Sequence, residues 1–202
     1  MFNLMVMPAS PALAVELSAH DAASRALLAA ARSLAVEAAA AGITAVDIVG
    51  SQDQRWYTAH TGSLQAWGAA TDLGGGNFLP EIMARYVLHS VPQLSVRGSR
   101  EAIGQPDPAA LTIVVADGSA GLTERAPLAL VPDAQAAHEW CEEVLMGASA
   151  SRAGEWLSQR GVIEPALWEE LAGLRPKKAQ LLATDATSVS YTHLTLPTKR
   201  IV

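Results

Sequence analysis

The stretch LTIVVADGSAGLTERAP, from Leu111 to Pro127, decides the fold class. Its first five residues, Leu111 to Val115, are apolar or β-branched and carry no charge, which is typical of a strand buried on both faces. Such a strand belongs near the middle of a sheet. Asp117, Gly118 and Ser119 follow it directly, and open α/β sheets place their ligand sites where buried strands end in turns. We therefore expect a site at the carboxyl end of this strand.

Short β-branched runs alternate with alanine-rich stretches in the first half of the chain. Residues 2–7 and 44–49 read as two further strands, and a long helix is expected between them. Ser18 and Asp21 have the spacing of a capping box at its start, and Gly42 marks its end. The sequence therefore predicts a single α/β domain with a largely parallel central sheet flanked by helices on both faces.

The remaining segments extend the same pattern. Asn77 is expected to cap a helix that runs to about residue 88, and a short strand is expected over 93–96. Three later helices and one strand are expected over residues 133–146, 151–160, 164–174 and 179–184. His138 and Cys141 stand three apart in the first of these helices. This spacing could suggest a metal or Cys–His site, but it favours an exposed histidine beside a small buried thiol.

A loop between the second strand and the next helix gathers aromatic residues. Trp56, Tyr57, His60 and Trp67 lie in a stretch with no clear helical or strand period. Aromatic side chains in such a loop could line a pocket or close the edge of the core. The three glycines at 74–76 are a weak signal for a phosphate loop, because no G-K-[ST] ending follows them.

Composition excludes several classes of protein. The chain has 202 residues, a formal net charge of −6 and no cluster of Lys and Arg, which disfavours a nucleic-acid partner. No apolar run reaches the length of a membrane span, and the first residues lack the basic region of a signal peptide. The single cysteine excludes an internal disulfide. We expect a cytoplasmic protein with no membrane or nucleic-acid partner.

The segment VVADGSAGLTERAP resembles part of the class III extradiol ring-cleavage dioxygenases, the LigB-like proteins and their Memo-like relatives, which reads roughly GDLSHRLTPDAP. Six residues match that motif in order: Asp117, Ser119, Leu122, Thr123, Ala126 and Pro127. Weaker matches join MPASPALAVEL to PHPPLLVPEI and GGGNFLPEIMARYVL to DHG-x-LVPLYFL. The resemblance covers most of residues 1–187 and implies a LigB-like α/β domain.

Enzymes of this family hold Fe(II) with two histidines and a carboxylate, which leaves open positions for catechol and O₂. The resemblance places these ligands on Ala9 or Ser10, on Asp53 and near Asp185, and it places the acid/base histidine on Ala120. Alanine is neither a ligand nor a proton carrier. The resemblance therefore implies the fold with no metal ligands and no cofactor, with Fe²⁺ as the alternative. Asp53 could still bind a hard cation, or it could be a solvated turn carboxylate.

Three functions are compatible with these residues. The first is a protein that has lost the metal site and binds a small polar ligand or a partner in a crevice. The second is an Fe(II)-dependent ring-cleavage dioxygenase, an oxidoreductase. The third is a serine hydrolase, because DGSAG approaches the G-x-S-x-G motif, although Asp117 replaces its first glycine. Asp117 and Ser119 are the candidate catalytic residues. The crevice residues are expected to be Ser10, Asp53, Asp117, Ser119 and Thr123.

The last residues differ in amino-acid composition from the rest of the chain. From Ser188 the sequence reads SVSYTHLTLPT, which resembles translated sequencing-adapter read-through, and the alanine-rich, acidic composition stops near Thr187. We therefore assign residues 1–187 to the domain and residues 188–202 to a non-native tail. Without Lys199 and Arg200 the formal charge changes from −6 to −8.

Overall fold

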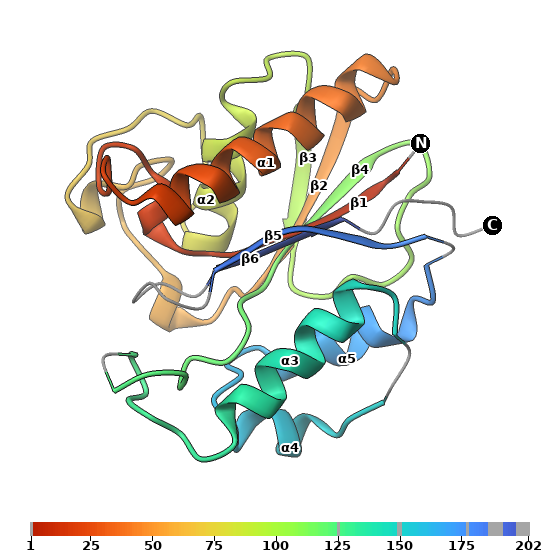
Figure 1. The fold of residues 1–202 in the computed structure, drawn as a ribbon. Helices are drawn as coiled ribbons and strands as arrows, with labels where there is room; N and C mark the ends of the chain where they lie inside the picture. The colour runs from red at the N-terminus through yellow and green to blue at the C-terminus, as the bar shows by residue number, and fades with distance from the viewer. Residues whose placement is uncertain (1, 125, 149–150, 177, 186–191, 197–202) are drawn as a thin grey trace.

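The computed structural model describes residues 2–124, 126–148, 151–176, 178–185 and 192–196. Figure 1 shows three layers with a sheet in the middle. Helices α1 (Ala22–Ala40) and α2 (Leu79–Leu88) cover one face of the sheet. Helices α3 (Ala134–Leu145), α4 (Gly154–Ser158) and α5 (Pro165–Gly173) cover the other face.

The sheet has the strand order β3-β2-β4-β1-β6-β5. Its strands are β1 (Leu4–Met7), β2 (Ala45–Gly50), β3 (Ser95–Arg100), β4 (Leu111–Val115), β5 (Gln180–Asp185) and β6 (Thr192–Leu196). The first four strands in this order are all parallel, whereas β6 is antiparallel to β1 and to β5. The predicted single α/β domain with a largely parallel sheet is confirmed. β4 lies between β1 and β2, as its uncharged β-branched sequence predicted.

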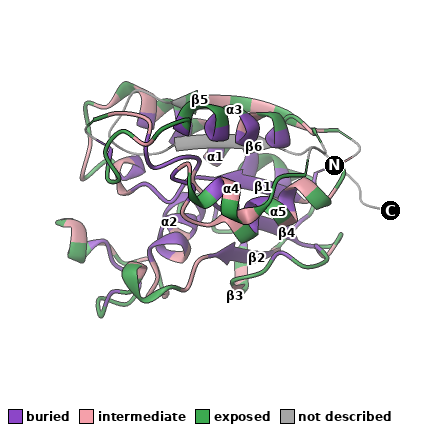
Figure 2. Ribbon diagram, turned by 90° about the horizontal axis from the view of Figure 1, so that it is seen from below, coloured by how far each residue is buried: buried purple, intermediate pink, exposed green. Residues whose placement is uncertain are grey.

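Side chains point alternately to the two faces along each strand, so the core has two parts, one beneath each layer of helices. In β1, Met5 and Met7 pack with α1 and α2, whereas Leu4 and Val6 pack with α3 and α5. Successive side chains of a strand point to opposite faces, so a strand buried on both faces must be apolar throughout. Figure 2 shows that the central strands are buried. Among the described residues, no helix is long and apolar enough to cross a membrane.

Two predicted helix caps are wrong, although both helices exist. Asp21, and not Ser18, caps α1 by accepting hydrogen bonds from the amides of Ala23 and Ser24 at 3.1 and 3.2 Å. Phe78 occupies the cap position of α2 without a side-chain hydrogen bond. Asn77 instead uses its side-chain amide to tie down the preceding loop, because Nδ2 donates to the carbonyl oxygen of Thr58 at 2.9 Å.

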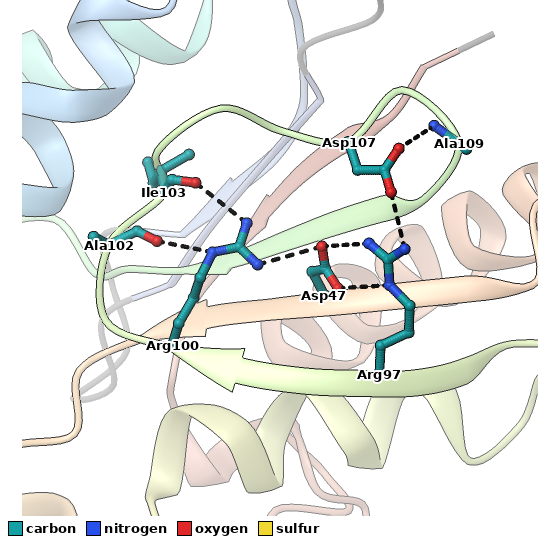
Figure 3. Close-up of polar contacts among 7 residues, drawn as sticks. All are labelled: Asp47, Arg97, Arg100, Ala102, Ile103, Asp107 and Ala109. Atoms are coloured by element: carbon teal, nitrogen blue, oxygen red, sulfur yellow. Dashed lines mark hydrogen bonds and ion pairs between the residues drawn. The ribbon is translucent and has the colours of Figure 1, made fainter.

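A carboxylate on β2 binds two arginines of the neighbouring strand β3 (Figure 3). Asp47 on β2 accepts hydrogen bonds from Nε and Nη2 of Arg97 at 2.9 and 2.7 Å, and Nη1 of Arg100 lies 3.3 Å from it. Arg97 also reaches Asp107 at 2.9 Å. The Asp47 side chain is only 11% exposed, so its charge depends on these arginines. The hydrogen bond from Arg97, followed by the contact with Arg100, holds the pKa of Asp47 below its usual range.

Replacing Asp47 with asparagine should lower the free energy of unfolding at neutral pH by about 2 kcal/mol, because a two-point bond to a charged donor is lost. A lowered pKa in the folded state means that this stability is present above the unfolded pKa, near 3.9, and is lost as the pH falls through the folded value. Urea unfolding at pH 7 and pH 3 measures both effects. Asp72→Asn, at an exposed loop position, is the matched control. Equal stability of wild type and Asp47→Asn at pH 7 would contradict this account.

Strand β6 lies inside the segment that was assigned to a non-native tail. Residues 192–196 form this strand, whereas residues 188–191 and 197–202 lie outside the described residues. β6 pairs with β1 at one position, Val6 with Thr195, whereas β4 pairs with β1 at four positions. The division of the chain at residue 187 stays a prediction.

Deleting residues 188–202 should leave the melting temperature unchanged if the segment is foreign to the fold. The reason is that β1 keeps its four pairs with β4 and both of its apolar faces stay packed by helices. A thermal melt of the shortened chain measures this. A loss of several degrees would show that β6 belongs to the domain.

Candidate functional site

Three parallel strands end at the same edge of the sheet. Met7 of β1 and Gly50 of β2 both pair with Val115 of β4, so the turns after these strands are neighbours. The carboxyl end of β4, where the sequence predicts a site, therefore lies beside the turns that follow β1 and β2. The backbone approaches closely here, because a Cβ on Gly50 would lie 2.6 Å from Cβ of Pro80 at the start of α2. Only glycine fits at the end of β2.

A cavity of about 500 Å³ lies at this edge. Its wall consists of the turn after β1 (residues 9–12), Leu17 and Ser18, Leu79 at the start of α2, and Trp56, Trp67, Asp117 and Pro127. Apolar side chains make up most of this wall, and the volume lies within the range of about 300–1,000 Å³ that is usual for small-molecule sites. The position after β1 and β4 is the one that open α/β sheets use for ligands.

The aromatic loop contributes two indoles to the cavity. Trp56 and Trp67 line it and also pack, partly buried, against the core on the α1 and α2 face. The two possibilities for this loop, lining a pocket and closing the core, are therefore both realised. Two short 3-10 helices, η2 (Gln54–Trp56) and η3 (Gln65–Trp67), end at these tryptophans and fix their places.

Asp117 is held from two sides in the wall of the cavity. The amide of Ala9 donates to its carboxyl oxygens at 3.2 and 3.4 Å. Nε1 of Trp168, a fully buried residue of α5, donates to the main-chain carbonyl oxygen of Asp117 at 2.7 Å. The side chain is therefore bound to the turn after β1, and its backbone is bound to the opposite layer of helices. Asp117 has little freedom to move.

The surroundings of Asp117 disfavour its charged form. Burial raises the pKa of its carboxyl well above the usual range, the negative charge of Glu164 raises it further, and the Ala9 amide opposes both effects. Glu164 is the N-cap residue of α5 and accepts a hydrogen bond from Nε1 of Trp56 at 3.0 Å. Burial raises the pKa of Glu164 as well. Asp117 lines the cavity and Glu164 stands behind its wall, and the pKa values of both carboxyls are raised.

Ser10 is the second residue of the predicted crevice that lines the cavity. It is buried, and its Oγ accepts a hydrogen bond from the amide of Ala12 at 3.2 Å, which caps the short 3-10 helix η1 (Pro11–Leu13). The hydroxyl proton stays available to a ligand, because the cap uses the oxygen as an acceptor.

Ser119 was predicted to lie in the crevice, and the structure corrects this. The residue is fully buried, and its hydroxyl donates to the carbonyl oxygen of Arg160 at 2.6 Å while it accepts from the amide of Gly121 at 3.2 Å. Its role is to tie the turn after β4 to the turn between α4 and α5. A hydroxyl enclosed in this way is neither a ligand group nor an exposed nucleophile, which removes the support for a serine hydrolase.

Asp53 and Thr123 also lie outside the cavity wall. Asp53 is exposed and forms an ion pair with Arg55 at 2.9 Å, and this hydrogen bond lowers the pKa of Asp53 to about 2. It accepts from the Arg55 amide as well, so it acts as the solvated turn carboxylate that was one of its two interpretations. Thr123 uses its carbonyl oxygen to accept from Ala126 at 3.0 Å.

The pair on α3 differs in part from its prediction. Cys141 is buried, as expected, but His138 is also buried, and the prediction of an exposed histidine is wrong. Burial lowers the pKa of His138 and raises the pKa of Cys141. Both residues belong to the layer of helices on the far side of the sheet from α1 and α2.

The residues present do not fit an iron site of the kind that the resemblance implies. Ala9 has no side-chain ligand atom, and its backbone amide already donates to Asp117. Ala120 is buried and also has no ligand atom in its side chain. Asp53 is neutralised by Arg55. The side chain of Asp185 lies outside the described residues. Throughout the described part of the chain, no group of three or more His, Cys, Asp or Glu side chains could hold a metal ion.

The purified protein should therefore carry no stoichiometric iron or zinc, and anaerobic reconstitution with Fe(II) should give no cleavage of catechol. Imidazole ligands contribute most of the affinity of a two-histidine, one-carboxylate site, and alanine at position 9 removes one of them. Elemental analysis and an oxygen-uptake assay measure the two outcomes. Near-stoichiometric iron with turnover of a catechol would overturn this prediction.

Comparison with known proteins adds no assignment. No protein-family model matches this chain, and none of the curated proteins matches it.

Proposed function

We propose that this protein binds a small, largely apolar molecule with one polar group in the cavity at the carboxyl ends of β1 and β4. The single observation that carries this proposal is the cavity of about 500 Å³, whose apolar wall holds two indoles and one half-buried carboxyl. A few polar groups in an otherwise apolar concave site are typical of small-molecule binding, because the wall supplies affinity and the polar group fixes orientation.

The ligand proposed here is less polar than the one that the sequence suggested. A ligand held by five polar residues would need Asp53, Ser119 and Thr123 in the wall, and the wall contains only Ser10 and Asp117 of that group. The ligand body therefore contacts Trp56, Trp67 and the apolar side chains, and its polar group meets Asp117. We also propose that the chain is a relative of the LigB-like dioxygenases that has lost the metal site. The match around Asp117 and the alanines at positions 9 and 120 support this.

A fluorescent apolar probe tests whether the cavity accepts a ligand. N-phenyl-1-naphthylamine should bind with a blue-shifted emission and should be excited by energy transfer from Trp56 and Trp67. Ala12→Phe should abolish binding, because Ala12 lines the cavity and the added ring would fill it. Ala29→Phe, at an exposed position of α1, is the matched control and should bind like wild type. Equal binding by both variants would place the probe elsewhere and contradict the proposal.

A further inference from the structure

Among the described residues that line the cavity, Asp117 is the one with an ionisable side chain. The charge that these residues can give the wall is therefore negative. A second acid, Glu164, stands behind the wall, near enough to raise the pKa of Asp117, and it is joined to the wall through the indole N–H of Trp56. A ligand with a negative group would meet no opposite charge on this wall. A ligand with a positive group would meet a carboxyl that lacks a cationic partner among its described contacts.

The rest of the wall also suits a cation. Indole is the aromatic group that attracts cations most strongly, and Trp56 and Trp67 provide two of them in one cavity. The attraction grows when the cation is desolvated, and the apolar side chains around the indoles exclude water. An organic cation loses little hydration on entry compared with a metal ion, because its charge is spread over a larger group.

We infer that the cavity takes a small organic cation, a substituted ammonium group attached to an apolar body, with Asp117 as its counter-charge and Trp56 and Trp67 around it. This inference rests on the proposed function, since it assigns the chemical class of the ligand in the same cavity. The ammonium group replaces the proton of Asp117. Entry of the cation therefore releases a proton to solvent wherever the free protein holds Asp117 in its acid form.

Glu164 acts on this site as a positioning residue that does not line the cavity. The charged groups that face the pair from neighbouring segments are Asp53 and Arg55, which are ion-paired with each other and act on Glu164 with opposite sign. The charge of Glu164 keeps the proton on Asp117 to a higher pH than burial alone would. Glu164→Gln keeps an oxygen for the Trp56 indole and removes the charge.

Two probes of the same shape and different charge test the inference. Phenyltrimethylammonium and tert-butylbenzene differ by one positive charge and are otherwise alike. The cation should bind about tenfold more tightly than the neutral probe once the pH is high enough for Asp117 to be charged, and this ratio should shrink as the pH falls and Asp117 takes up its proton. At a pH where free Asp117 still holds its proton, titration calorimetry in buffers of different ionisation enthalpy should show proton release with the cation and none with tert-butylbenzene.

Variants separate the contributions of the two acids. Asp117→Asn should reduce the affinity ratio severalfold, to the part that the two indoles supply, and abolish proton release, whereas Asp72→Asn, at an exposed loop position, should change neither. Glu164→Gln should shift the pH at which the cation gains its advantage to a lower value. This shift in the pH profile distinguishes an electrostatic role from a structural one.

The outcomes are distinguishable from those of the proposed function. If neither probe binds to wild type, the cavity does not accept ligands and both proposals fail. If both probes bind with equal affinity and without proton release, the cavity is a ligand site but the cation inference is overturned. A tenfold preference that survives Asp117→Asn would also overturn it, since the counter-charge would lie elsewhere. The proton-release measurement on wild type decides the matter even if Asp117→Asn does not fold.

Discussion

Replacing Trp168 with alanine should lower the free energy of unfolding by about 4 kcal/mol. Trp168 is fully buried in the core between β4 and the layer of α3, α4 and α5, and truncation would leave a cavity that the surrounding helices cannot fill. The same change removes the hydrogen bond of 2.7 Å that Nε1 donates to the Asp117 carbonyl oxygen. The end of β4 would then lose its attachment to α5, and binding of N-phenyl-1-naphthylamine should be lost as well.

Trp168→Phe separates packing from the hydrogen bond. Phenylalanine keeps most of the buried ring but cannot donate to the Asp117 carbonyl oxygen, so we expect a loss of about 2 kcal/mol. Urea unfolding at neutral pH measures both variants. A loss below about 1 kcal/mol for Trp168→Ala would contradict the position of this residue in the core, since such small effects are typical of surface sites.

Replacing Gly161 with alanine should lower the free energy of unfolding by about 2 kcal/mol, because alanine is strained in the left-handed backbone conformation that Gly161 adopts. Gly161 has φ of +83°, and a Cβ there would lie 2.8 Å from Oγ of Ser119 and 3.1 Å from the amide of Gly121. The turn could accept the methyl group only by moving away from the loop after β4. The amide of Ala120 would then lose its hydrogen bond of 2.7 Å to the Gly161 carbonyl oxygen.

Gly173→Ala is the matched control for this substitution. Gly173 is the last residue of α5, a Cβ added there would meet no atom within 4 Å, and its φ is not in the left-handed region. Alanine there should leave stability unchanged or raise it slightly, because alanine is the better helix former. Thermal melts of both variants measure the difference. Equal melting temperatures would show that the turn at Gly161 does not hold the loop after β4.

The sheet could be predicted from sequence because its signals are local. Leu111 to Val115 is uncharged and β-branched, and the strand β4 has the same limits. α1 repeats its buried residues at the helical period through Leu27, Ala31, Leu34 and Ala38. The helix caps were less predictable, because Ser18, Asp21 and Asn77 are all residues that cap well, and tertiary contacts decide which one does.

The site could be predicted only in part, because its residues come from segments that are distant in sequence. The position of Asp117 at the end of a buried strand identified it, and parallel pairing brought Ser10 beside it. Glu164 was missed: it precedes Pro165 at the start of a short helix, and no pattern in the sequence connects it to Asp117. Ser119 was misassigned because its enclosure depends on the carbonyl oxygen of Arg160, which no side-chain motif reveals.

The indole N–H signals of the five tryptophans provide the most direct test of the binding cavity. In a ¹⁵N-labelled sample, addition of phenyltrimethylammonium at pH 8 should shift the signals of Trp56 and Trp67, which line the cavity. The signals of Trp140 and Trp156, which belong to the opposite layer of helices, should stay in place. Shifts confined to Trp140 and Trp156, or no shift at millimolar probe, would contradict a ligand site at the carboxyl ends of β1 and β4.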